Sequence, residues 1–106
     1  MNLVSDQVSS KSVDRMRDYQ SLENKLRAVV NDLAGELKDD KRLRDIYELI
    51  GQHGEYGEAY RLLCYVIAEK QLAIPADMYQ EFVELGGQMD LEDKPWLSLA
   101  ALAKKV

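Results

Sequence analysis

The hydrophobic positions between about Val13 and Leu37 recur with the spacing of one face of a helix. Leu22, Leu26, Val29 and Leu33 fall at i, i+4, i+7 and i+11, and charged residues lie between them. This spacing predicts a long amphipathic helix. Residues 1–12 lack this periodicity and show no obvious cap. We therefore expect residues 1–12 to be a flexible N-terminal tail and residues 13–106 to be a single helical domain.

Two further helices are predicted in the middle of the chain. Asp39 or Asp40 offers an N-cap for the first of them. Its apolar residues share one face and are Leu43, Ile46, Tyr47 and Ile50. The sequence GQHG at residues 51–54 ends this helix. The next helix spans about Glu55 to Gln71 and is apolar almost all round in its middle, so it is expected to be the buried centre of the domain.

Proline and glycine mark the ends of the remaining elements. Pro75 is suited to the first turn of a helix that reaches Leu85, and Gly86-Gly87 is expected to end that helix. After a polar connection, Pro95 opens a short terminal helix. No bounded, alternating, β-branched run predicts a strand. The predicted fold is therefore all-α, a compact bundle of four main helices plus a short C-terminal helix.

Length and composition place the chain among globular proteins. A chain of 106 residues with 46% hydrophobic and 31% charged residues is long enough for one core. Its longest apolar run, Leu62–Ala68, is far shorter than the roughly 20 residues of a membrane span. Residues 1–12 do not have the pattern of a secretion signal, so a cytoplasmic location is expected. The single cysteine, Cys64, fits a reducing compartment.

The negative charge of the chain is concentrated in residues 51–93. That segment contains two bases, Arg61 and Lys70, and nine carboxylates: Glu55, Glu58, Glu69, Asp77, Glu81, Glu84, Asp90, Glu92 and Asp93. The formal net charge of −5 originates there, because residues 1–50 are nearly balanced. Such a surface repels nucleic acids and anionic membranes and attracts basic proteins.

The residues that most often carry catalysis are few. Cys64 lies in an apolar run and is predicted to be a small core residue, while His53 is predicted to cap or pack in a loop. One histidine and one cysteine cannot form a zinc site, and the segment Asp90–Asp93 lacks the pattern of a calcium loop. Phosphate-binding glycine motifs are absent. We therefore expect neither an enzyme nor a cofactor or metal site.

The predicted partner-binding residues are acids together with one tyrosine. On the helix after Pro75, the acids Asp77, Glu81 and Glu84 fall at i, i+4 and i+7 and form a ridge without intervening bases. Tyrosine combines an apolar body with a polar tip and is favoured at interfaces. The residues expected to contact a partner are Glu55, Glu58, Asp77, Tyr79, Glu81, Glu84, Asp90, Glu92 and Asp93.

The segment from Ile46 to Leu99 resembles a known family. The residues that carry the resemblance are Tyr47-Glu48-Leu49-Ile50, His53-Gly54-Glu55, Ala59, Leu62-Leu63, Ile67, Ile74-Pro75, Tyr79, Leu85-Gly86, Met89, Leu91 and Trp96-Leu97. Their arrangement is similar to that of small helical immunity proteins of the MafI type, which resemble in role the CdiI-like immunity proteins of contact-dependent growth inhibition. The resemblance implies a helical cytoplasmic antitoxin that binds the C-terminal nuclease domain of a polymorphic toxin, commonly an RNase.

These observations lead to one hypothesis and two alternatives. The hypothesis is an immunity protein that occludes the basic active-site region of a cognate nuclease toxin, without binding nucleic acid or membrane. The first alternative is a small helical adaptor or homodimer that pairs through the Leu22, Leu26, Val29 and Leu33 seam. The second is an enzyme that uses acidic residues for metal-dependent phosphohydrolysis. Such an enzyme requires carboxylates that project inward from facing helices. The oligomeric state and the toxin's substrate are left open.

Overall fold

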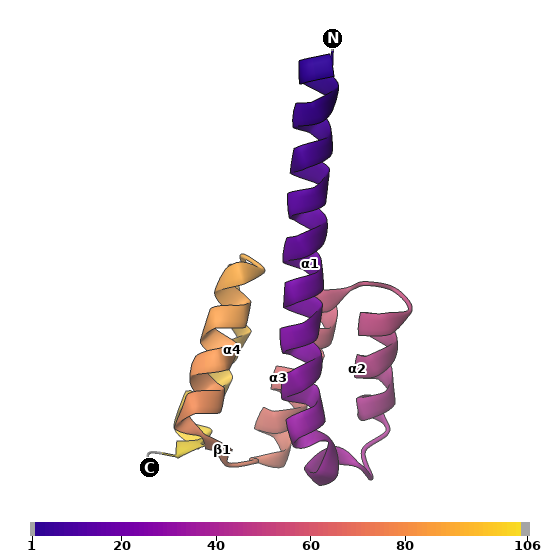
Figure 1. Cartoon of the computed structure of the whole chain (residues 1–106). Coiled ribbons are helices and arrows are strands. Elements are labelled where there is room, and N and C mark those ends of the chain that lie inside the picture. Colours follow the sequence, from indigo (N-terminus) through magenta and orange to yellow (C-terminus); the bar gives the residue numbers. More distant parts are fainter. Residues whose placement is uncertain (1, 105–106) are drawn as a thin grey trace.

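The structure is a computed structural model that describes the backbone of residues 2–104 and the side chains of residues 19–103. It is mostly helical, with almost no strand. Figure 1 shows how the elements are arranged. In chain order they are α1 (Asn2–Leu37), α2 (Arg42–Gly51), α3 (Tyr56–Lys70), β1 (Ile74–Pro75), α4 (Ala76–Gln88), the 3-10 helix η1 (Pro95–Leu102) and β2 (Ala103–Lys104).

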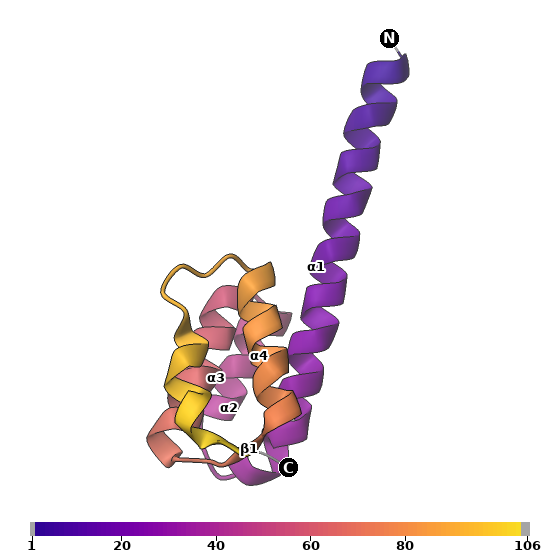
Figure 2. The same cartoon turned by 90° about the vertical axis from the view of Figure 1, so that its left-hand side faces the viewer.

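Helix α1 is longer than the apolar stripe predicts. It begins at Asn2, so residues 2–12 continue the helix where a separate tail was expected. Its N-terminal part stands clear of the other elements (Figure 2), and the molecule measures 56 × 27 × 23 Å. Residues 2–12 contain neither glycine nor proline, so a helix anchored by the core can propagate through them. That this segment is flexible stays a prediction.

The predicted stripe of α1 forms one side of the hydrophobic core. Leu22, Leu26, Val29 and Leu33 are all at most 9% exposed. Helix α3 forms the centre and packs against α1, α2 and η1. Its side chains Tyr60, Leu63 and Ile67 are completely buried. The prediction that the third helix is the buried centre is therefore confirmed.

The turn between α1 and α2 is held by Asp40. The Asp40 carboxylate accepts a hydrogen bond of 2.9 Å from the backbone N–H of Arg42, the first residue of α2. Asp40 thus satisfies one of the N–H groups that a helix start leaves unpaired, although the N-cap residue is Lys41, one position later than the sequence predicted, and has no side-chain cap. Asp39, the other candidate cap, is exposed.

Helix α4 passes through the two glycines that were expected to end it. It continues to Gln88, and its end is closed by two hydrogen bonds. The N–H of Asp90 donates to the carbonyl of Gly87 (3.1 Å), and the N–H of Leu91 donates to the carbonyl of Gly86 (3.2 Å). Asp90 has a φ of 55° and takes the left-handed position that glycine usually occupies. The prediction that Gly86-Gly87 terminates the helix is wrong.

A short parallel β pair was not predicted. Ile74 pairs with Ala103 and Pro75 with Lys104, which joins the start of α4 to the end of η1. Each strand has two residues, too few for an alternating pattern to be visible in the sequence. Pro75 lies in β1 and immediately precedes α4, with a φ of −63°. Within the described part of the chain, no helix has both the length and the apolar character that a membrane span needs.

Candidate functional site

Six of the nine carboxylates in residues 51–93 are exposed and have no base within 4 Å among the described side chains. They are Glu55, Asp77, Glu81, Glu84, Asp90 and Glu92. All six belong to the predicted partner-binding set. Exposed like charges that face water without counter-charges create a local negative potential. The acidic character seen in the sequence is therefore present on the folded surface.

The two bases of this region are already engaged with carboxylates. The Arg61 guanidinium donates two hydrogen bonds to Asp93, of 2.9 and 3.1 Å, and lies 3.8 Å from Glu58. This pairing lowers the pKa of Asp93 and raises that of Arg61. Lys70 lies 3.3 Å from Asp40, outside the acidic segment. Neither base is left to compensate the six open carboxylates.

The ridge of acids on α4 borders a groove between α4 and α1. Glu81 and Glu84 line this groove, and its floor is formed by Ala28 and Val29 of α1 and Leu85 of α4. Among the described side chains, Lys25 is the one base that lines it. Asp77 lies in the first turn of α4, where its carboxylate accepts a hydrogen bond from the N–H of Met78. Two of the three acids of the ridge, Glu81 and Glu84, thus line this groove beside α1.

A second groove lies where α1, the start of α3 and the end of α4 meet. Its lining includes Tyr19, Leu22, Glu55, Tyr56, Glu58 and Met89, and we call it the tyrosine groove. The rings of Tyr19 and Tyr56 lie 6.4 Å apart at an angle of 42°, within the range of favourable aromatic pairs. Gln88 lines both grooves, which therefore meet at the end of α4.

Glu23 of α1 binds the hydroxyl of Tyr56, one of the two tyrosines that line the groove. The Tyr56 hydroxyl donates a hydrogen bond of 2.7 Å to Glu23, and Arg27 donates another of 2.9 Å to the same carboxylate. The Tyr56 hydroxyl first and Arg27 second lower the pKa of Glu23. Because its hydroxyl is held in this way, the ring of Tyr56 has a defined orientation toward Tyr19.

Sequence reasoning missed Tyr19 as a site residue. It lies three residues before Leu22 and so extends the apolar stripe of α1 by one turn, but 58% of it is exposed because the core ends at Leu22. An aromatic residue at the end of such a stripe was the available signal. Tyr79, the predicted anchor, is half-buried and packs against the core.

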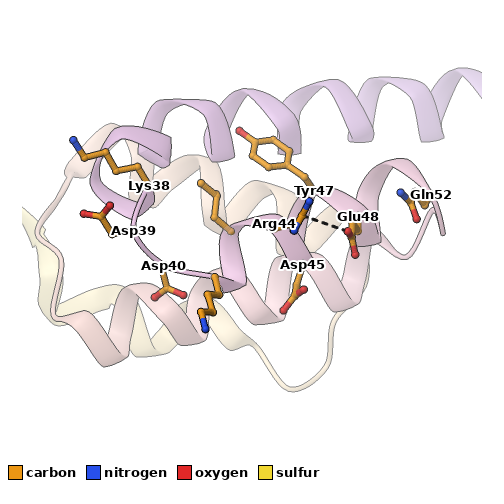
Figure 3. A pocket seen from close by; sticks show the side chains of 10 residues that line it. Lys38, Asp39, Asp40, Arg44, Asp45, Tyr47, Glu48 and Gln52 are labelled. Carbon is orange, nitrogen blue, oxygen red and sulfur yellow. Dashed lines mark ion pairs between the residues drawn. The ribbon is translucent and has the colours of Figure 1, made fainter.

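A broader hollow lies at the other side of the molecule, between the end of α1 and α2. Figure 3 shows its lining, in which bases and acids alternate; Arg44 and Glu48 form a 3.9 Å ion pair there. The lining includes Lys38, Asp39, Lys41 and Asp45. Because the charges of the two signs are mixed, this hollow has no strong preference for a partner of either charge.

Cys64 and His53, the two residues considered for catalysis, lie in different environments. Cys64 is buried, as predicted, and burial raises the pKa of its thiol to about 12. His53 is exposed in the turn between α2 and α3. Among the side chains that the structure describes, no three His, Cys, Asp or Glu residues are close enough together to hold a metal ion.

Comparison of the chain with models of known families, with characterised proteins and with solved structures finds no match.

Proposed function

We propose that this chain is an immunity protein that binds and neutralises the nuclease domain of a polymorphic toxin. The observation that carries the proposal is the set of six exposed carboxylates that have no basic partner among residues 19–103, while both bases of the same segment, Arg61 and Lys70, are engaged in ion pairs. A surface with this charge favours a cationic protein. The resemblance of residues 46–99 to MafI-type immunity proteins favours a nuclease toxin domain as this cationic protein.

The mechanism is steric and electrostatic. A nuclease presents Lys and Arg side chains to the phosphates of its substrate, and carboxylates can occupy the same positions. Complementary charge also speeds association at low salt, by one to three orders of magnitude. A compact bundle of four main helices with a short C-terminal helix supplies a rigid support for the acidic surface. The proposed location is the cytoplasm, where a toxin that has entered would act, and the proposed substrate of the toxin is RNA.

A homodimer formed through the α1 seam is not supported by the packing. Leu26, Val29 and Leu33 are buried inside the chain and Leu22 is only 9% exposed, so the seam as a whole is already covered and cannot pair with a second chain. A small helical adaptor that uses another surface remains the second candidate. Determination of the mass in solution, alone and with a partner, separates a constitutive dimer from a monomer that binds a different protein.

The proposal predicts that the reading frame directly upstream of this chain encodes the toxin, and it is tested with the C-terminal domain of that protein. That C-terminal domain is expressed together with the chain, and the purified complex is assayed for binding and for cleavage of RNA and DNA. We expect a basic domain whose nuclease activity is lost at a one-to-one ratio. A domain without nuclease activity, or a nuclease that remains active when saturated with this chain, would contradict the proposal.

A further inference from the structure

We propose that the tyrosine groove is the docking centre of the acidic surface and that its occupant is an arginine side chain of the partner, flanked by an apolar residue. The assignment of the partner as a basic protein rests on the proposed function. The position of the groove and the chemistry of its occupant rest on the geometry of Tyr19, Tyr56, Glu55 and Glu58.

The aromatic pair offers a face on which a guanidinium can lie. More than half of Tyr19 is exposed, and Tyr56 lies beside it. Arginine favours such faces because its planar, weakly hydrated cation is attracted by the ring. The same contact occurs elsewhere in this chain, where the Arg42 guanidinium carbon lies 5.7 Å from the centre of the Tyr65 ring.

The charge around the groove favours a cation. Two carboxylates line it, Glu55 and Glu58, together with the guanidinium group of Arg61, while Glu23, Arg27 and Asp93 lie outside the lining. Arg27 is hydrogen bonded to Glu23, and Arg61 is hydrogen bonded to Asp93. Subtracting these two pairs leaves Glu55, which has no base within 4 Å among the described residues, and Glu58, which lies 3.8 Å from Arg61. These two carboxylates would pair with the incoming arginine.

The groove is also prepared for an apolar neighbour of that arginine. Leu22 and Met89 line it beside the two rings. The Tyr56 ring is oriented before binding by its hydrogen bond to Glu23, so less conformational entropy is lost when the partner binds. Buried aromatic anchors surrounded by a polar rim are typical of the residues that dominate the energy of an interface.

The first experiment needs no toxin. The probe is the peptide acetyl-Leu-Arg-Leu-amide, and the control is the same peptide with citrulline, which keeps the shape of arginine but not its charge. Both are titrated into the intact protein, and the tyrosine ring signals are followed by carbon–proton NMR. We expect the signals of Tyr19 and Tyr56 to shift with the arginine peptide only, while the Tyr65 signals stay in place. Equal shifts with citrulline, or shifts at Tyr65 as large as those at Tyr19, would overturn the proposal.

The second experiment uses the upstream-encoded domain. Tyr19→Ala is compared with Tyr65→Ala, a matched control because the two tyrosines are 58% and 59% exposed. We expect Tyr19→Ala to raise the dissociation rate at least about tenfold and Tyr65→Ala to change it less than about twofold. Circular dichroism verifies that both variants fold. If the domain binds and both variants dissociate alike, the groove assignment fails and the proposed function stands. If the domain does not bind, the proposed function fails, and the peptide titration still decides on the groove.

Discussion

The indole ring of Trp96 occupies the space that a side chain on Gly86 would need. A Cβ on Gly86 would lie 2.2 Å from both Cε3 and Cζ3 of Trp96 and 3.0 Å from the hydroxyl of Tyr60. The absence of a side chain at this position therefore lets η1 pack closely against α4. The hydroxyl of Tyr60 in turn donates a hydrogen bond to the carbonyl of Phe82 in α4, which joins α3 to the same contact.

This contact predicts opposite effects for two neighbouring glycines. Gly86→Ala should lower the free energy of unfolding by about 1–3 kcal/mol, because Trp96 must move to admit the methyl group. Gly87→Ala meets nothing within 4 Å and should be neutral or stabilise the helix by up to about 1 kcal/mol. Urea unfolding of both variants measures the difference. Equal stabilities of the two variants would show that Trp96 does not pack against Gly86.

Removal of a core side chain from α3 tests its place at the centre. Leu63 is completely buried, so Leu63→Ala should cost about 2–5 kcal/mol of unfolding free energy. Leu97 is 59% exposed, and Leu97→Ala should change stability by no more than about 0.5 kcal/mol. Both values come from urea unfolding followed by circular dichroism. A loss below about 0.5 kcal/mol for Leu63→Ala would place α3 at the periphery.

Asp40 should make stability depend on pH in the acid range. Its carboxylate accepts two hydrogen bonds from the Arg42 side chain, of 2.9 and 2.8 Å, and lies 3.3 Å from Lys70. Arg42 is the main cause that holds the pKa of Asp40 well below its usual value. A lowered pKa in the folded state stabilises the fold above the unfolded pKa, which is about 4, and this contribution is lost as the pH falls through the folded pKa.

The corresponding measurement compares Asp40→Asn with the unaltered chain from pH 7 to pH 2. Asp40→Asn should unfold at a lower temperature at pH 7, and the difference should shrink below about pH 4, because the unfolded chain then binds a proton at Asp40 while the folded chain still holds this carboxylate charged. Asp39→Asn is the control, because Asp39 is the exposed neighbour. A difference between Asp40→Asn and the unaltered chain that stays constant down to pH 2 would contradict the assignment.

The charge of the α4 ridge should govern the rate of association with the partner. Changing Asp77, Glu81 and Glu84 together to their amides should slow association and reduce its dependence on salt, since exposed charges are screened beyond about 8 Å at physiological ionic strength. The control changes Asp39, Asp45 and Glu48, which line the hollow of Figure 3, and so alters the net charge equally. Stopped-flow measurements at several salt concentrations compare the two. A larger effect of the control would place the interface at α2.

Cys64 and His53 should be dispensable for neutralisation. Because the Cys64 thiol is buried and its pKa is about 12, a disulfide reagent should modify it slowly at pH 8 and rapidly in urea. Cys64→Ser and His53→Ala should both keep binding and inhibition. Loss of inhibition in a variant that still folds and still binds would point to a chemical activity of the chain.

The sequence and the structure agree most closely where periodicity is strong. The stripe from Leu22 to Leu33 and the buried middle of α3 were predicted because each depends on local spacing, and the predicted cap at Asp40 lies one residue before the observed N-cap, Lys41. The start of α1 was missed because residues 2–12 contain no apolar stripe that marks a helix. The β pair of Ile74 with Ala103 was missed because it joins residues far apart in the sequence.

The sequence by itself determined the helical character, the buried centre and the uneven distribution of charge, because these follow from residue types at regular spacings. Only the tertiary structure decided which carboxylates of residues 51–93 have a basic partner, since Arg61 and Lys70 pair with Asp93 and Asp40, which no local pattern identifies. It also decided that Trp96 packs against Gly86 and that the ring of Tyr19 lies beside the ring of Tyr56. Such contacts arise from the packing of one helix on another, which depends on all the side chains between them and cannot be seen in any one segment.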